Sequence, residues 1–135
     1  IFLYRKKTSV CGKILEINFK VKTLDFLELK TNYNINVLAI INTHAHYDHI
    51  SAVSTLKDTL EVPFYLHSKD KRLLKSANLY RILFDGEQTI TIPSIDHFLD
   101  ECNESLIFNN IEVKTYDGLT INFAQSIEAR VIVRG

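Results

Sequence analysis

The strongest constraint on the fold is a continuous apolar run of five residues, Val37 to Ile41. A run without polar residues at alternate positions is typical of a β-strand that is covered on both faces. It is also the longest purely apolar stretch in the chain, and five residues are too few to span a membrane. The sequence therefore predicts a buried strand here and no membrane-spanning segment.

Strand and helix patterns alternate around this run. Residues Ile14 to Lys22 place apolar side chains at every second position, which predicts a strand with one solvated face. Another buried strand is expected from Val62 to His67. Helices are expected from Thr23 to the turn-forming residues Thr31 to Asn34, from Ile50 to Leu60 with one apolar face, and from Ser68, as its cap, to about Ser76.

The second half of the sequence is richer in strand patterns. Gln88 to Ile92 alternates, and a short helical turn is expected around Ile95 to Leu99. The pair Asn109-Asn110 favours a hairpin turn between Leu106–Phe108 and Ile111–Tyr116, and further strands are expected at Leu119–Phe123 and Ala129–Val133. Together these patterns predict a single α/β (α+β) domain over residues 1–135, with a β-α-β-α-β first half.

Composition excludes several classes of function. The 135 residues are 46% hydrophobic and 24% charged, which is typical of one globular domain. Sixteen basic residues balance sixteen acidic ones, so no nucleic-acid or membrane partner is expected. Two distant cysteines, Cys11 and Cys102, do not form a disulfide framework, and with no recognisable signal peptide they favour a cytoplasmic protein. The chain has no Met, from which we expect a trimmed or partial sequence.

The candidate chemistry is concentrated directly after the buried strand. Three of the five histidines lie within Thr43-His44-Ala45-His46-Tyr47-Asp48-His49. In an extended backbone, residues two apart point to one side, so His44 and His46 can share one metal ion. Asp48 and His49 project elsewhere, where they can serve a second ion, or Asp48 can accept a proton from a metal-bound water. Imidazole and carboxylate ligands suit Zn and tolerate Fe or Mn.

The other two histidines carry no such pattern. His67 ends a predicted strand, and His97 lies beside Asp96 in a predicted polar helical turn. We expect structural or surface roles for both of them.

Positions 40 to 50, Ile-Ile-Asn-Thr-His-Ala-His-Tyr-Asp-His-Ile, resemble the His-x-His-x-Asp-His loop of the metallo-β-lactamase superfamily, and Tyr47-Asp48-His49 resembles glyoxalase II-like hydrolases in particular. The resemblance extends from about Ile35 to about Val113. It implies an αββα sandwich, with His44 and His46 on a first metal ion and Asp48 and His49 on a second. It also implies hydrolysis of a small thioester or ester, because a metal ion lowers the pKa of its water to about 7 and makes hydroxide available at neutral pH.

The sequence departs from that family in its later ligands. No His follows His97, so the third His and the bridging Asp of the family have no match, although Asp117 lies where it could substitute for the third His. We therefore expect a sandwich that is incomplete at its C-terminal side, spanning the first half to two-thirds of a domain. β-Lactams and phosphodiesters remain alternative substrates, and a non-catalytic domain that retains part of the metal site remains an alternative function. The oligomeric state is not predicted.

Overall fold

Two β-sheets organise the chain in the computed structural model, which describes residues 2–5, 12–15, 23–85, 89–102, 106–108 and 111–129. The larger sheet has five strands in the order β2-β1-β3-β4-β5, and the smaller is the hairpin β6-β7. β1 pairs antiparallel with β2 and β3, whereas β3, β4 and β5 are parallel. The strands are β1 (Phe2–Arg5), β2 (Gly12–Leu15), β3 (Asn36–Ile41), β4 (Phe64–Leu66), β5 (His97–Phe98), β6 (Leu106–Phe108) and β7 (Ile111–Val113).

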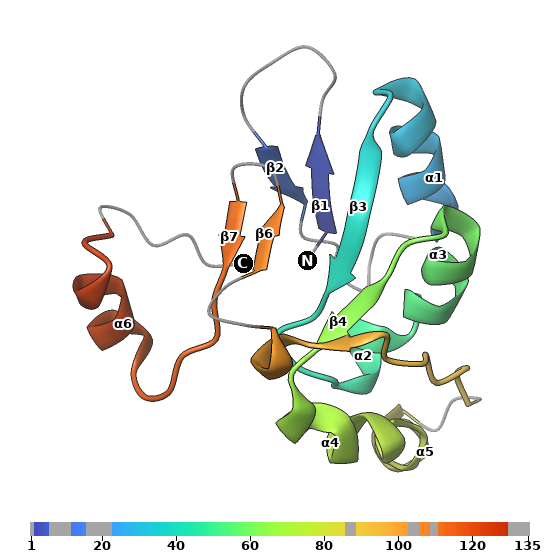
Figure 1. The fold of residues 1–135 in the computed structure, drawn as a ribbon. Helices are drawn as coiled ribbons and strands as arrows, with labels where there is room; N and C mark the ends of the chain where they lie inside the picture. Colours follow the sequence, from blue (N-terminus) through green and yellow to red (C-terminus); the bar gives the residue numbers. More distant parts are fainter. Residues whose placement is uncertain are drawn as a thin grey trace.

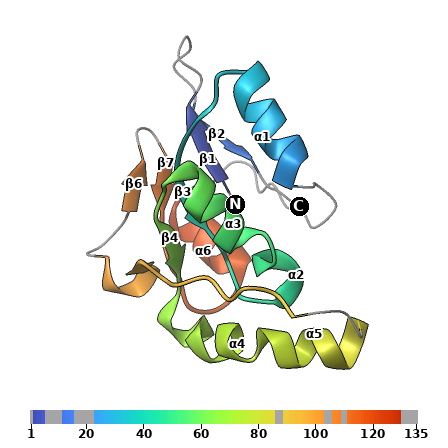
Figure 2. The ribbon, with the colours of Figure 1, turned by 90° about the vertical axis from the view of Figure 1, so that its right-hand side faces the viewer.

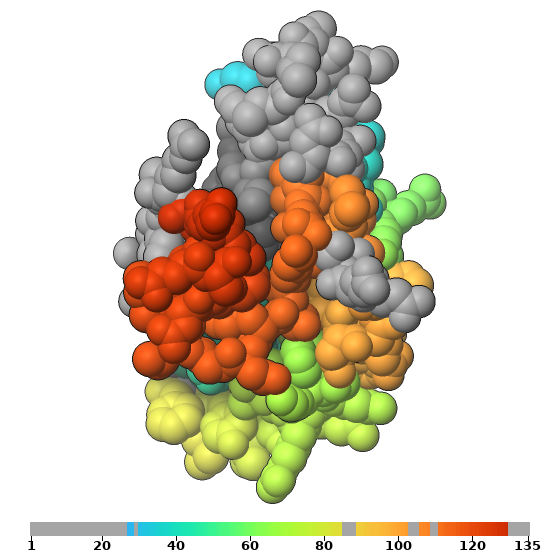
Figure 3. Space-filling view, turned by 60° about the vertical axis from the view of Figure 1, so that its left-hand side comes forward, coloured from blue at the N-terminus to red at the C-terminus, as the bar shows by residue number. Residues whose placement is uncertain are grey.

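The helices lie on both sides of these sheets. Figures 1 and 2 show α1 and α3 on one side of the large sheet, with the β6-β7 hairpin on the other side and α6 beyond it. Seen from that second side, α6 and the hairpin lie next to each other above α4 and α5 (Figure 3). The helices are α1 (Thr23–Asn32), α2 (Tyr47–Ile50), α3 (Val53–Leu60), α4 (Lys71–Lys75), α5 (Ala77–Asp85) and α6 (Thr120–Ser126), with 3-10 turns η1 (Ser68–Asp70) and η2 (Leu99–Glu101).

The predicted buried strand is confirmed as β3, and it is covered on both faces. Val37 and Ile40 pack into a core with helix residues such as Leu56, while Ala39 and Ile41 pack toward the hairpin. Ile40 is fully buried. Burial of an aliphatic side chain of this size contributes about 1.5–3 kcal/mol, so β3 is the strand on which both layers depend.

The predicted helix from Ile50 to Leu60 is divided into two. α2 ends at Ile50 and α3 begins at Val53, because the backbone at Ala52 (φ −97°, ψ −8°) leaves ideal helical geometry. Both Ile50 and Val53 are buried. The apolar spacing therefore identified the buried face correctly, but it carries no information on a local change of the backbone.

The predicted helix after β4 also begins differently. Ser68 is not its cap: the N-cap of η1 is His67, whose Nδ1 accepts the Lys69 N–H at 3.1 Å. The Ser68 hydroxyl donates to Asp100 instead. The strand itself is shorter than Val62–His67, and α5, which follows α4, has no counterpart among the predicted elements.

Two predictions in the second half are wrong. Leu119–Phe123 is not a strand: Leu119 is the N-cap of α6, and the helix itself begins at Thr120. The alternating Leu119 and Ile121 are both exposed. Within the predicted helical turn Ile95 to Leu99, His97–Phe98 form β5, paired parallel with β4, and the helical turn η2 begins only at Leu99.

The predicted hairpin is confirmed by β6 and β7, which pair antiparallel, although β7 ends at Val113 rather than Tyr116. Three predicted segments lie outside the described residues: the hairpin turn at 109–110, residues 16–22 of the first predicted strand and residues 130–133 of the last predicted strand. None of the described helices is long and apolar enough to cross a membrane.

Candidate metal centre

The histidine-rich loop leaves the large sheet at the C-terminal end of β3. Asn42, which is buried, fixes this exit: its backbone N–H donates to the Tyr65 carbonyl at 3.2 Å. Its side-chain Nδ2 donates to the His49 carbonyl at 3.0 Å, which joins the end of β3 to the last turn of α2. The loop is thus anchored at both ends, as ligand-bearing segments require.

Three imidazole rings meet in this loop. The centroid of the His44 ring lies 4.6 Å from that of His46 and 4.4 Å from that of His49, both in edge-on geometry. Asp48 follows His46 and Tyr47 into α2, and its Oδ2 lies 3.5 Å from His49 Nε2. The structure therefore brings all four predicted residues into one cluster, which we call the histidine cluster (His44, His46, Asp48 and His49).

His44 occupies the centre of the histidine cluster. Its Nδ1 lies 3.0 Å from the Thr43 hydroxyl, so Nε2 is the ring nitrogen left for another partner. Burial lowers the pKa of His44, and the neighbouring His49 and His46 lower it further against the opposing effects of Asp70 and Asp48. A lowered pKa favours the neutral ring, which is the form that binds a metal ion.

The donor types in the histidine cluster fit a divalent metal ion. Imidazole nitrogens with a carboxylate oxygen are ligands of Zn, Fe and Mn. Within the part of the chain that the structure describes, however, no three His, Cys, Asp or Glu side chains are arranged to hold one ion. The cluster supplies neighbouring donors without a closed coordination sphere.

The fold and the cluster agree with a comparison against known families. The sequence model of the metallo-beta-lactamase superfamily matches residues 27–113, which include β3, the histidine cluster and the hairpin. The chain belongs to this superfamily. Its α/β architecture, with two sheets and flanking helices, is that of the superfamily over the matched part.

Individual proteins are similar to parts of this chain. The chain is 45% identical over 63 residues to "Probable metallo-hydrolase YqgX" of Bacillus subtilis, a match that covers 47% of this chain and 30% of the relative. Among solved structures, the BLEG-1 B3 metallo-beta-lactamase is 32% identical with a TM-score of 0.55, over 64% of this chain and 42% of that one. A di-iron-bound form of TTHA1623 is 34% identical with a TM-score of 0.49, over 55% and 36% respectively. The chain thus spans under half the length of each of these proteins.

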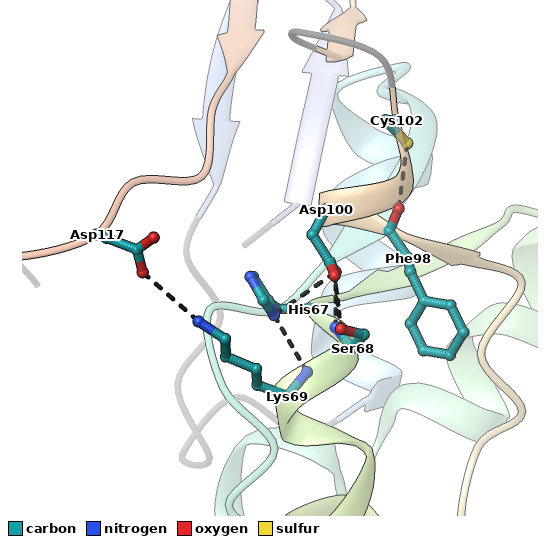
Figure 4. Close-up of polar contacts among 7 residues, drawn as sticks. All are labelled: His67, Ser68, Lys69, Phe98, Asp100, Cys102 and Asp117. Atoms are coloured by element: carbon teal, nitrogen blue, oxygen red, sulfur yellow. Dashed lines mark hydrogen bonds and ion pairs between the residues drawn. The ribbon is translucent and has the colours of Figure 1, made fainter.

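The remaining candidates from the sequence have other roles in this superfamily member. His67 caps η1, and its Nδ1 lies 3.5 Å from Asp100 (Figure 4). His97 lies on β5 rather than in a helix, and its ring packs against Tyr65 of β4 with 4.9 Å between the ring centroids. The Asp117 side chain is 99% exposed, and its Oδ1 lies 3.6 Å from Nζ of Lys69 in η1 (Figure 4).

Sequence reasoning missed the residues that hold the loop. Besides Asn42, Asp70 contacts it directly: one carboxylate oxygen accepts the Ala45 N–H at 3.3 Å. Ala45 lies between two of the histidines, and Asp70 comes 25 positions later. No local spacing in the sequence signals such a contact, because it depends on the parallel pairing of β3 and β4.

Proposed function

We propose that the protein containing this chain is a metal-dependent hydrolase that cleaves a small thioester or ester. His44 and His46 would hold a first metal ion, and Asp48 and His49 a second. Zn is the first candidate, with Fe or Mn as alternatives. The observation that carries the proposal is the contact between three imidazole rings at the C-terminal end of a buried parallel strand. Ligand sites of open α/β sheets are found at this edge.

The contacts of His44 and Asp48 define their tasks in this proposal. A bound divalent ion would lower the pKa of a water molecule and polarise the carbonyl of the substrate. His44 presents Nε2, because its Nδ1 is occupied by Thr43. The Oδ2 of Asp48 faces His49, which leaves its other oxygen to accept a proton from the attacking water.

The thioester specificity rests on the likeness of Tyr47-Asp48-His49 to glyoxalase II-like hydrolases. A β-lactam is the second candidate substrate, favoured by the similarity to the BLEG-1 B3 metallo-beta-lactamase. Equal numbers of acidic and basic residues do not favour an RNA substrate. A cytoplasmic location, where a free Cys102 would remain reduced, belongs to the same proposal.

Metal content tests the proposal directly. The purified chain should retain about one or two equivalents of Zn, Fe or Mn after dialysis. The double variant His44→Ala/His46→Ala should lose most of that metal, because two neighbouring ligands are gone. His97→Ala is the matched control, since this exposed histidine lies on β5 outside the cluster. Less than one equivalent in the unmodified chain, unchanged in the double variant, would overturn the proposal for this chain.

Substrate choice needs a separate assay. Metal-loaded protein is offered S-lactoylglutathione and a chromogenic β-lactam, with the His44→Ala/His46→Ala variant as the blank. Faster hydrolysis of the thioester supports the main proposal, whereas faster hydrolysis of the lactam replaces it with the second. Metal binding without hydrolysis of either substrate would exclude both of these substrates and leave the substrate class open.

A further inference from the structure

Asp70 is the residue outside the histidine cluster that contacts the middle of the loop. It is the last residue of η1 and directly precedes α4, on the chain segment that follows β4. Because β3 and β4 are parallel neighbours, the segments after their C-terminal ends lie at the same edge of the sheet. Asp70 makes no capping hydrogen bond to α4, so its carboxylate is not committed to its own helix.

The hydrogen bond from Ala45 to Asp70 restrains the backbone between His44 and His46. The Ala45 side chain is fully buried in the helix-side core, while its N–H donates to Asp70 Oδ1 at 3.3 Å. At the next residue, His46, the backbone is extended (φ −64°, ψ 147°). In an extended segment the orientation of the central residue sets the directions of the side chains before and after it. Fixing Ala45 therefore fixes the directions from which His44 and His46 project.

Asp70 is itself held by a network of hydrogen bonds. Its N–H donates to the His67 carbonyl at 3.0 Å, within the turn that His67 caps. Ser68 donates both its N–H, at 2.8 Å, and its hydroxyl to the two carboxylate oxygens of Asp100 in η2 (Figure 4). η1 is thus bound at its start to the segment that follows β5. A partner fixed in this way can position a loop, whereas a mobile surface carboxylate could not.

We propose that Asp70 is a positioning residue for the metal-binding loop, an inference that rests on the proposed function of the histidine cluster. It acts through a hydrogen bond to the Ala45 N–H and touches neither metal nor substrate. Outer partners of this kind change metal affinity by about 10–100-fold when they are removed. The role requires an acceptor oxygen at this position, so the Asp70→Asn variant should keep the role and the Asp70→Ala variant should lose it.

Amide hydrogen exchange in the metal-free chain tests the hydrogen bond itself. In Asp70→Ala, the Ala45 amide should exchange about tenfold faster or more, because its acceptor is lost. In Asp70→Asn it should stay within about threefold of the unmodified chain, since the amide oxygen still accepts. The Ile40 amide, bonded to the Pro63 carbonyl in the sheet, serves as the internal reference for an intact fold. Unchanged exchange at Ala45 in Asp70→Ala would overturn the inference.

Zinc affinity, measured by competition with a chelator, tests whether the hydrogen bond matters for metal binding. Asp70→Ala should bind zinc at least about tenfold more weakly, whereas Asp70→Asn should have nearly the affinity of the unmodified chain. The control Asp58→Ala, which removes an exposed carboxylate from α3, should not change zinc affinity. Equal losses in Asp70→Ala and Asp70→Asn would show that charge rather than positioning matters and would overturn the inference. Failure of the proposed function has a different signature: the unmodified chain then binds no zinc, while Ala45 exchange still responds to Asp70→Ala.

Discussion

Removal of the Asp96 carboxylate should destabilise the fold through one particular hydrogen bond. Asp96 Oδ2 accepts the N–H of Phe64 at 2.8 Å, and Phe64 is fully buried in β4. Asp96 Oδ1 accepts from Lys57 Nζ at 2.8 Å, but Lys57 also donates to the carbonyl and hydroxyl of Ser94. In Asp96→Ala, Lys57 therefore keeps two acceptors, while the buried Phe64 N–H loses this one.

The magnitude follows from these two unequal losses. An unsatisfied buried N–H costs about 1–3 kcal/mol. The ion pair with Lys57 adds only about 0.2–1 kcal/mol, since the Asp96 side chain is 33% exposed and solvent screens the charge. Asp96→Ala should thus lower the free energy of unfolding by about 1–4 kcal/mol. Asp96→Asn keeps an acceptor oxygen for Phe64 and should cost about 1 kcal/mol or less.

Urea unfolding followed by circular dichroism measures these differences, with Asp58→Ala as the control for loss of a carboxylate at this end of the sheet. The pH dependence provides a second readout. Burial alone would raise the pKa of Asp96, but hydrogen bonds from Lys57 and Phe64 and the Lys57 charge hold it below the ordinary value of 3.8. Stability from this group is therefore complete above pH 3.8 and lost as pH falls through the lower folded-state pKa. An Asp96→Asn variant as unstable as Asp96→Ala would refute the hydrogen-bond argument.

Three further perturbations test the packing and the loop. Phe64→Ala should lower the free energy of unfolding by about 3–5 kcal/mol, because it opens a cavity in the core, and the urea midpoint reports this. Asn42→Ala should cost about 1–2 kcal/mol through loss of the bond to the His49 carbonyl; an unchanged urea midpoint would contradict that role. Hydrogen bonds from the Ser68 hydroxyl and N–H lower the pKa of Asp100 to about 2. Thermal scans should therefore show the unmodified chain losing its advantage over Asp100→Asn only as pH falls from about 4 toward 2.

Local patterns in the sequence were sufficient for the central strand and the histidine cluster. The run from Val37 to Ile41 has no polar residue, and a strand with two covered faces is the structure that uses such a run. The spacing of His44, His46, Asp48 and His49 likewise depends only on residues that are adjacent in sequence. Local geometry decides both features, so both were predictable.

Patterns that depend on burial elsewhere were not sufficient. The alternation at Leu119, Ile121 and Phe123 predicted a strand, but α6 buries only Ala124, while Phe123 stacks on Tyr116 at 4.4 Å between ring centroids. Alternation identifies a strand only when one of its faces is covered, and here the described part of the chain covers neither Leu119 nor Ile121. His97 was assigned to a helix because its pairing with Tyr65 joins strands that lie far apart in sequence.

The parallel order β3-β4-β5 explains why three segments that are separate in sequence are joined at one edge of the sheet. Each parallel strand ends at the same edge, so the loop after β3, η1 after β4 and η2 after β5 are neighbours. Hydrogen bonds then connect them in sequence: Asp100 holds Ser68, and Asp70 at the end of the same turn holds Ala45. The histidine motif alone specifies the side chains that we propose as metal ligands. The turns that follow β4 and β5 supply Asp70, which contacts the motif at Ala45, and Asp100, which holds the start of η1. A chain with the same motif after an isolated strand would lack both.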